Sequence, residues 1–281
     1  MLQEVIQLIQ EEWSQKEPVW KNLPLSKRDF QFLEKECNAE SEFDPMWARR
    51  SMLNGMKTGH TRYEGKVCPY GQVIALYADD SQRHDLPWGL WGRILRLYSD
   101  CADAKPFRIY FLAAPHLRLF PAHNEPITAI HINGGYTYHC NRETIMIYRA
   151  EDATRVLLHE LMHSCCMDKM ENGVDLVEAE TEAWAELLHA AVLSEGDEAV
   201  FRREVKKQSD WMQAQNAVVR RHMKKPMDFP WRYTIGKEEV WRRWGILQRA
   251  SPMQVASLRL TPPPTASQKA QHGVGSESMI L

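Results

Sequence analysis

The apolar positions in the first hundred residues recur at the helical period. In the first segment they lie on one face of an amphipathic helix, at Leu2, Val5, Ile6, Ile9 and Trp13. Further helix starts are marked by a capping residue or a proline, at Ser26, Asp44-Pro45 and Pro87. We therefore expect residues 1–104 to form a helical N-terminal region, with one short apolar strand at residues 72–77.

The pattern then changes to runs of β-branched and aromatic residues, which favour strands. Four such runs predict strands at residues 107–112, 127–132, 136–140 and 144–148. Gly134 and Gly135 favour a hairpin, and the short connection at residues 141–143 favours a second one. We expect the last three strands to form an antiparallel meander that leads into the next helix.

Helical periodicity returns after the last of these runs. It predicts helices at about residues 151–167, 175–193, 198–222 and 237–249. The final stretch is rich in proline, glycine and small polar residues, so we expect residues 251–281 to form a disordered tail. The order of elements predicts an α+β fold, with a small antiparallel or mixed sheet and the functional helices in residues 105–250.

Composition narrows the class of protein. The chain has 281 residues, 44% of them hydrophobic, and a formal net charge of -2, which favours neither nucleic acid nor an anionic membrane as a partner. The basic residues between Arg202 and Lys225 are typical of a solvated helix face. No apolar run approaches the roughly 18 residues that span a bilayer, and the N-terminus lacks the pattern of a signal peptide. We therefore expect a soluble, intracellular protein without a membrane partner.

The six cysteines include no C-x-x-C pair. In a chain of this size without a secretion signal, this pattern predicts reduced thiols and no disulfides. Cys165 and Cys166 follow the charged motif closely, but helix geometry turns them away from its histidines, which predicts a packing role for both.

The candidate chemistry lies in the helix at residues 151–167, which contains His159-Glu160-Leu161-Met162-His163. Four residues of separation place both imidazoles on one helix face, where they can bind one metal ion, with Glu160 beside them. The next helix carries several carboxylates. Glu178, Glu182, Glu186 and His189 share one face of it, whereas Glu180 points away. We expect Zn²⁺ bound by His159, His163 and Glu182, with Glu178 as the alternative third ligand.

This motif, together with Glu182-Ala183-Trp184-Ala185-Glu186, resembles the gluzincin class of zinc metallopeptidases. The resemblance covers roughly residues 127–193 and implies a zincin-like fold. It implies that Glu182 completes the metal site and that Glu186 supports a ligand histidine, although the class usually has aspartate at the latter position. The segment from His131 to Arg149 is also loosely similar to zincin-like proteins of large DNA viruses, which implies an infected-cell or virion setting.

These residues predict a zinc-dependent hydrolase, most simply a peptidase with a polypeptide substrate. Zinc lowers the pKa of a bound water toward about 7, and Glu160 would act as the general base. One alternative is a metal-containing binding or virion-structural protein without turnover, and another is hydrolysis of a different amide or of an ester by the same zinc-bound water. The intact Glu160 favours the enzyme, because a structural site does not need this residue.

Further residues are candidates for supporting roles. The developing oxyanion needs a second donor, for which the candidates are His189, His222 and Tyr233. The predicted strands at residues 127–132 or 136–140 offer an edge for an extended peptide. His131 and His139 are candidates for the lining of the cleft, although structural roles are more common for such histidines.

Overall fold

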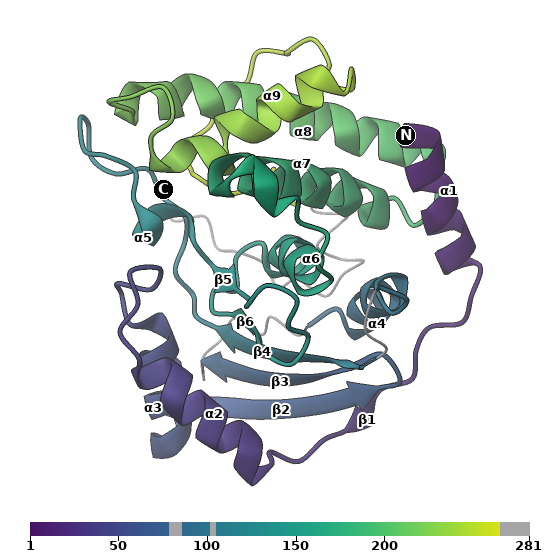
Figure 1. Cartoon of the computed structure of the whole chain (residues 1–281), viewed down its shortest axis with the longest axis vertical. Coiled ribbons are helices and arrows are strands. Elements are labelled where there is room, and N and C mark those ends of the chain that lie inside the picture. The colour runs from purple at the N-terminus through teal and green to yellow at the C-terminus, as the bar shows by residue number, and fades with distance from the viewer. Residues whose placement is uncertain (79–85, 102–104, 265–281) are drawn as a thin grey trace.

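The computed structural model describes residues 1–78, 86–101 and 105–264. A mixed sheet lies at its centre, with the strand order β1-β2-β3-β4-β6-β5 (Figure 1). The strands are β1 Lys21–Asn22, β2 Thr61–Cys68, β3 Gly71–Ala78, β4 Phe107–Ala113, β5 Gly135–Tyr136 and β6 Ile145–Ile147. Strands β3, β4 and β6 are parallel to one another, whereas β1 and β2 on one side and β5 on the other pair antiparallel with their neighbours.

Helices cover both faces of this sheet. They are α1 Leu2–Trp13, α2 Lys27–Asn38, α3 Ala48–Thr58, α4 Trp88–Leu97, α5 Ala129–Ile132, α6 Ala153–Ser164, α7 Val174–Leu193, α8 Glu198–Val219 and α9 Ile235–Arg243. Figure 1 shows α7 lying over α6, with α8 and α9 beyond it. Within the described ranges, no helix combines the length and the apolar character needed to cross a membrane.

The two faces of the central strands build two cores. Val73 and Ala75 of β3 pack with α4, α6 and α7, while Ile74 and Leu76 pack with α2 and α3. All four side chains are fully buried. A strand covered on both faces has a continuous apolar sequence, which explains why β3 and β4 show no alternation.

The α+β class is confirmed, and so are three of the predicted strands. Residues 72–77, 107–112 and 144–148 correspond to β3, β4 and β6. The strand predicted at residues 127–132 is wrong, because this segment contains the short helix α5. Thr128 and His131 cap the start of that helix reciprocally, with the Thr128 amide donating to Nδ1 of His131 at 3.0 Å.

The predicted antiparallel meander is also wrong. Strand β4 pairs in parallel with β6, and residues 114–144 form the long connection that such pairing requires. Of the strand predicted at residues 136–140 only Tyr136 lies in a strand. Gly134 and Gly135 do not form a hairpin, since Gly135 begins β5, which pairs with β6 at the sheet edge.

The structure differs from the predicted organisation in the N-terminal region and in the C-terminal segment. Residues 1–104 are not uniformly helical, because they supply β1, β2 and β3, and these strands share one sheet with the later ones. The tail predicted at residues 251–281 is packed in its first part, where Leu258 and Leu260 are 1% and 4% exposed. Residues 265–281 lie outside the described ranges.

Four of the six cysteines form disulfides, so the prediction of reduced thiols is wrong for them. Cys101 pairs with Cys165 and Cys140 with Cys166, at Cα distances of 5.6 and 4.7 Å. Cys37 and Cys68 are free and buried, and Cys165 is buried as predicted while Cys166 is exposed. The bonded residues are 64 and 26 positions apart, so local spacing carries no sign of the pairing.

Candidate metal centre

Helix α6 holds the motif between the edge of the sheet and α7 (Figure 1). Its two histidines lie one turn apart, and their Nε2 atoms approach to 2.9 Å. Glu178 in the first turns of α7 faces them: Oε2 lies 3.4 Å from Nε2 of His159, and Oε1 lies 3.9 Å from Nε2 of His163. One ligand atom from each of these three residues lies within 4.8 Å of the others.

The electrostatics of this group favour a cation. Burial by itself would lower the pKa of His159, but the carboxylates of Glu182 and Glu178 outweigh it and raise this pKa to about 10. Burial would raise the pKa of Glu178, yet its contacts with His159 lower it. The imidazole nitrogen atoms of His159 therefore lie in a strongly negative environment. This environment favours a positive charge, which is a proton in the metal-free protein and could equally be a metal cation.

Glu182, the third ligand favoured from the sequence, contacts a different partner. Both of its carboxylate oxygens accept from the guanidinium of Arg155, one of them from Nη1 at 3.0 Å. Arg155 is 1% exposed, and it holds the pKa of Glu182 well below the usual range against the effect of burial. Glu178, the alternative ligand, pairs with no arginine or lysine among the described residues and lies beside the histidines.

Each histidine has a second carboxylate behind it. Oε1 of Glu182 lies 3.1 Å from Nδ1 of His159, and Oδ2 of Asp168 lies 2.8 Å from Nδ1 of His163. Carboxylates in these positions fix the orientation of ligand histidines and raise their basicity. Glu182 thus lies one turn after Glu178 and beside His159, the position that the resemblance assigned to Glu186.

Asp168 was not singled out from the sequence. It follows His163 by five positions in the loop after α6, and Thr181 of α7 donates to its Oδ1 at 3.4 Å. The available signal was a carboxylate directly after the motif helix, where the chain must turn back toward α7.

Glu186 belongs to a buried charge network behind the site. Its Oε1 accepts from Nε of Arg155 at 3.2 Å and from Nζ of Lys237 at 2.5 Å. Lys237 and Glu186 are 0% and 1% exposed, respectively. Together with Glu182, these charges connect α6, α7 and α9, so Glu186 helps to position Arg155.

Glu160 faces a cavity of about 220 Å³ beside β5. A Cβ atom added to Gly135 would lie 2.6 Å from Cγ1 of Val156 and 3.1 Å from Oε1 of Glu160, so the glycine allows the sheet edge to approach this face of α6. Burial raises the pKa of Glu160 to about 7, against the opposing effect of His159 and His163. This value suits a group that accepts and returns a proton near neutral pH.

The same cavity is lined by residues from seven parts of the chain. They include His159, Glu160, His163, Glu178, Glu182, Tyr233, Arg118, Gly134, Gly135 and Leu260. Of the three predicted oxyanion donors only Tyr233 lines it. His222 instead bonds to the Glu125 carbonyl at 2.9 Å and stacks on Phe120, and His189 is not among the lining residues.

The two histidines predicted to line the cleft have other contacts. His131 caps α5, and His139 lies outside the cavity lining, with Nε2 3.4 Å from Oδ2 of Asp168. The side chain of His139 is 43% exposed. His139 therefore lies behind Asp168 and away from the metal donors.

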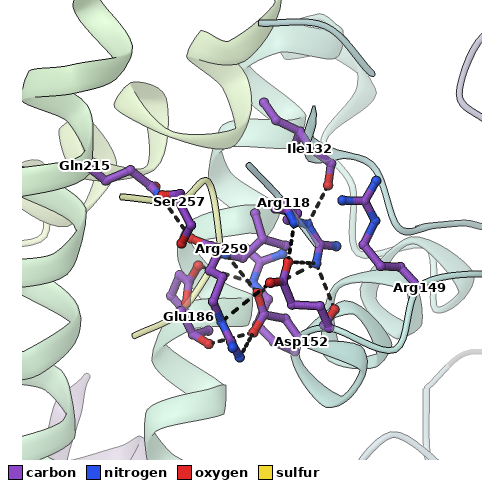
Figure 2. Close-up of polar contacts among 12 residues, drawn as sticks. Arg118, Ile132, Arg149, Asp152, Glu186, Gln215, Ser257 and Arg259 are labelled. Atoms are coloured by element: carbon purple, nitrogen blue, oxygen red, sulfur yellow. Dashed lines mark hydrogen bonds and ion pairs between the residues drawn. The ribbon is translucent and has the colours of Figure 1, made fainter. Parts of the chain in front are cut away.

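A second polar cluster holds the start of α6 (Figure 2). Asp152, the residue before the helix, accepts from Nη2 of Arg259 at 2.8 Å and from the amide of Leu260 at 2.9 Å. Arg118, from the loop after β4, donates through Nη1 to the carbonyl of Glu151 at 2.8 Å and through Nε to that of Ile132 at 2.7 Å. These contacts join the C-terminal segment and the rim of the cavity to the motif helix.

The donors fit a divalent metal such as zinc. Two imidazole nitrogens and one carboxylate oxygen form a common catalytic zinc site. The other nitrogen of each imidazole lies near a carboxylate, with a hydrogen bond to Asp168 at His163 and an ion-pair contact with Glu182 at His159. Comparison with known proteins gave no match to a family model, a curated protein or a solved structure. The assignment of this site therefore depends on the geometry and chemistry of the chain itself.

Proposed function

We propose that this chain is a zinc-dependent peptidase in which His159, His163 and Glu178 bind the metal. The convergence of three donor atoms within 4.8 Å, next to a buried glutamate, carries the proposal. Three protein ligands leave a coordination position for water or substrate, which is typical of catalytic and not of structural zinc sites.

Zinc at these donors would polarise the substrate carbonyl and lower the pKa of a water molecule. Glu160 would accept the proton of that water and return it to the leaving amine, since its raised pKa allows both states near pH 7. Burial raises the pKa of Tyr233 far above its usual value, so its hydroxyl stays protonated and able to donate to the developing oxyanion.

The edge of the sheet supports a polypeptide as the substrate. Strand β5 is the last strand in the order and pairs only with β6 among the described strands. Its Gly135 lies next to Glu160, so an extended peptide that paired with this edge would pass the general base. This arrangement favours hydrolysis of a peptide bond over that of a compact ester or amide.

The test combines metal content with hydrolysis. We expect one zinc per chain in the wild type and in Glu160→Gln, and loss of the metal in His163→Ala and Glu178→Gln. A fluorogenic peptide library should be cleaved by the wild type, with kcat lowered at least about a hundredfold in Glu160→Gln. Glu180→Gln is the matched control, because Glu180 lies on α7 and pairs with Arg243 at 3.6 Å, away from the cavity.

Two results would contradict the proposal. A wild type that binds no zinc after reconstitution would remove the metal site. A zinc-loaded protein that cleaves no peptide, or that cleaves equally well with Glu160→Gln, would favour a binding protein that holds its metal without turnover.

A further inference from the structure

Arg118 lines the same cavity and is fully buried, which is rare for an arginine. The residue is 0% exposed, although it lies in the loop after β4. Its backbone amide and Nη1 bond to Glu151, and Nε bonds to the carbonyl of Ile132 (Figure 2). The remaining nitrogen, Nη2, has no hydrogen-bond partner among the described residues. Because a guanidinium has five N–H donors, the two on Nη2 are unused.

Nη2 packs closely against a glycine. A Cβ atom added to Gly134 would overlap Nη2, so the glycine allows this nitrogen to lie at the wall of the cavity that both residues line. A Cβ atom added to the next residue, Gly135, would lie 3.1 Å from Oε1 of Glu160. Neighbouring Cα atoms are about 3.8 Å apart, so Nη2 and the Glu160 carboxylate lie no more than about 12 Å apart.

The local charge favours an anion. The three guanidinium groups of Arg118, Arg149 and Arg259 lie near the two carboxylates of Glu151 and Asp152, which leaves an excess of one positive charge in this group. Arg149 is 4% exposed, and its Nη1 also has no partner in the described part of the chain. Burial, followed by the repulsion from Arg118, lowers the pKa of Arg149 to about 10, which a bound anion would reverse.

We propose that Nη2 of Arg118 binds a carboxylate of the substrate, so that the enzyme selects peptides with a negative charge close to the scissile bond. This inference rests on the proposed peptidase function and names its substrate class. A separation of up to about 12 Å corresponds to no more than about three residues of extended chain. The carboxylate is therefore either a free C-terminus within three residues of the cleaved bond or an Asp or Glu side chain in the same range.

The test uses matched peptides that differ only in this charge. One pair has a free or an amidated C-terminus, and a second, amidated pair has Glu or Gln next to the scissile bond. We expect the wild type to favour the charged member of one pair by about tenfold or more in kcat/KM, because charge-assisted hydrogen bonds are stronger than neutral ones. The pair that shows the preference identifies the source of the carboxylate.

Two variants test the role of Arg118, one at the arginine itself and one at the glycine that packs against it. Arg118→Lys keeps the charge but removes the Nη2 donors, and Gly134→Ala keeps Arg118 but fills the space next to Nη2. Each should reduce the preference to within about twofold and leave hydrolysis of the neutral peptide measurable. Arg93→Lys is the matched control, since Arg93 is 9% exposed, bonds to the carbonyls of Glu12 and Gln15, and lies outside the cavity. Circular dichroism confirms that each variant is folded.

Binding separates failure of this inference from failure of the peptidase function. Calorimetry on zinc-loaded Glu160→Gln, and on the wild type if it cleaves nothing, compares the Kd values of the charged and neutral peptides. Tighter binding of a charged peptide without hydrolysis supports the carboxylate site and removes the peptidase. Cleavage or binding without any charge preference in the wild type overturns the inference, whether or not the variants fold.

Discussion

Glu178 and Glu182 lie one turn apart on α7, and replacing each by glutamine should have opposite consequences. Glu182→Gln removes the charge that faces Arg155, which is 1% exposed. Loss of one partner from a buried ion pair costs about 3–5 kcal/mol. Glu186 still lies 3.2 Å from Nε of Arg155 in the variant, so we expect the lower end, about 3 kcal/mol. Zinc should still bind, about 10–100-fold more weakly, because His159 loses its support.

Glu178→Gln should instead remove zinc binding and leave the metal-free protein nearly as stable. The Glu178 side chain is 22% exposed, and its ion-pair contacts among the described residues are with the two histidines. The protonated His159 loses one carboxylate but keeps Glu182 at 3.1 Å, so the free energy of unfolding should fall by only about 1 kcal/mol. The carboxylate oxygen that completes the metal donors is lost, so zinc binding should fall below detection at micromolar metal.

Urea unfolding in the presence of a chelator gives the stability of both metal-free variants, and competition with a chromophoric chelator gives their zinc affinity. Glu180→Gln on the same helix should match the wild type in both assays. Glu178 is not the third ligand if Glu182→Gln loses zinc at unchanged stability while Glu178→Gln keeps it. That result would return Glu182 to the role of third ligand.

Three further predictions follow from the same contacts. Because the pKa of His159 is raised to about 10, protonation of His159 stabilises the metal-free fold, fully so below pH 6.5. Melting temperatures measured in chelator should therefore fall between pH 6.5 and 10, and a flat profile would contradict this. Asp168→Asn should weaken zinc binding about 10–100-fold in the chelator competition, because His163 loses its charged partner, and unchanged affinity would exclude that role. Cys101→Ser should lower the free energy of unfolding by about 4 kcal/mol, since the bond to Cys165 closes a 64-residue loop, and urea unfolding that matches the wild type would count against the disulfide.

The motif helix was predictable because its information is local. Four residues of separation fix the relative directions of two side chains on any α-helix, whatever surrounds it. The predicted helices at residues 151–167 and 175–193 correspond to α6 and α7. His159, Glu160 and His163 therefore face one cavity, as the spacing indicated.

The choice between Glu178 and Glu182 was not local. Both residues lie on the same face of α7, and the way α7 crosses α6 decides which of them meets the histidines. A sequence signal existed in Arg155, one turn before His159 on the motif helix. A buried arginine at that place requires a carboxylate from the neighbouring helix, and Glu182 provides it.

Local sequence patterns likewise do not predict the strand order or the cysteine pairing. The run at residues 127–132 has the composition of a strand, yet the capping contacts of Thr128 and His131 make a helical turn the better solution there. The edge position of β5 depends on a parallel pair formed across more than thirty residues. Such pairings are decided by packing of the whole sheet and leave little trace in periodicity.

The distribution of buried charge links the fold to the proposed chemistry. Arg118, Arg155 and Lys237 are at most 1% exposed, and two of them line the cavity that holds the metal donors. Stability does not require them, because replacing buried ion pairs by apolar groups is often neutral or stabilising. A metal site does require fixed carboxylates behind its histidines, and Arg155 with Lys237 keeps Glu182 and Glu186 in place. Arg118 differs from both, because its Nη2 has no hydrogen-bond partner among the described residues. The proposed substrate carboxylate would supply that partner.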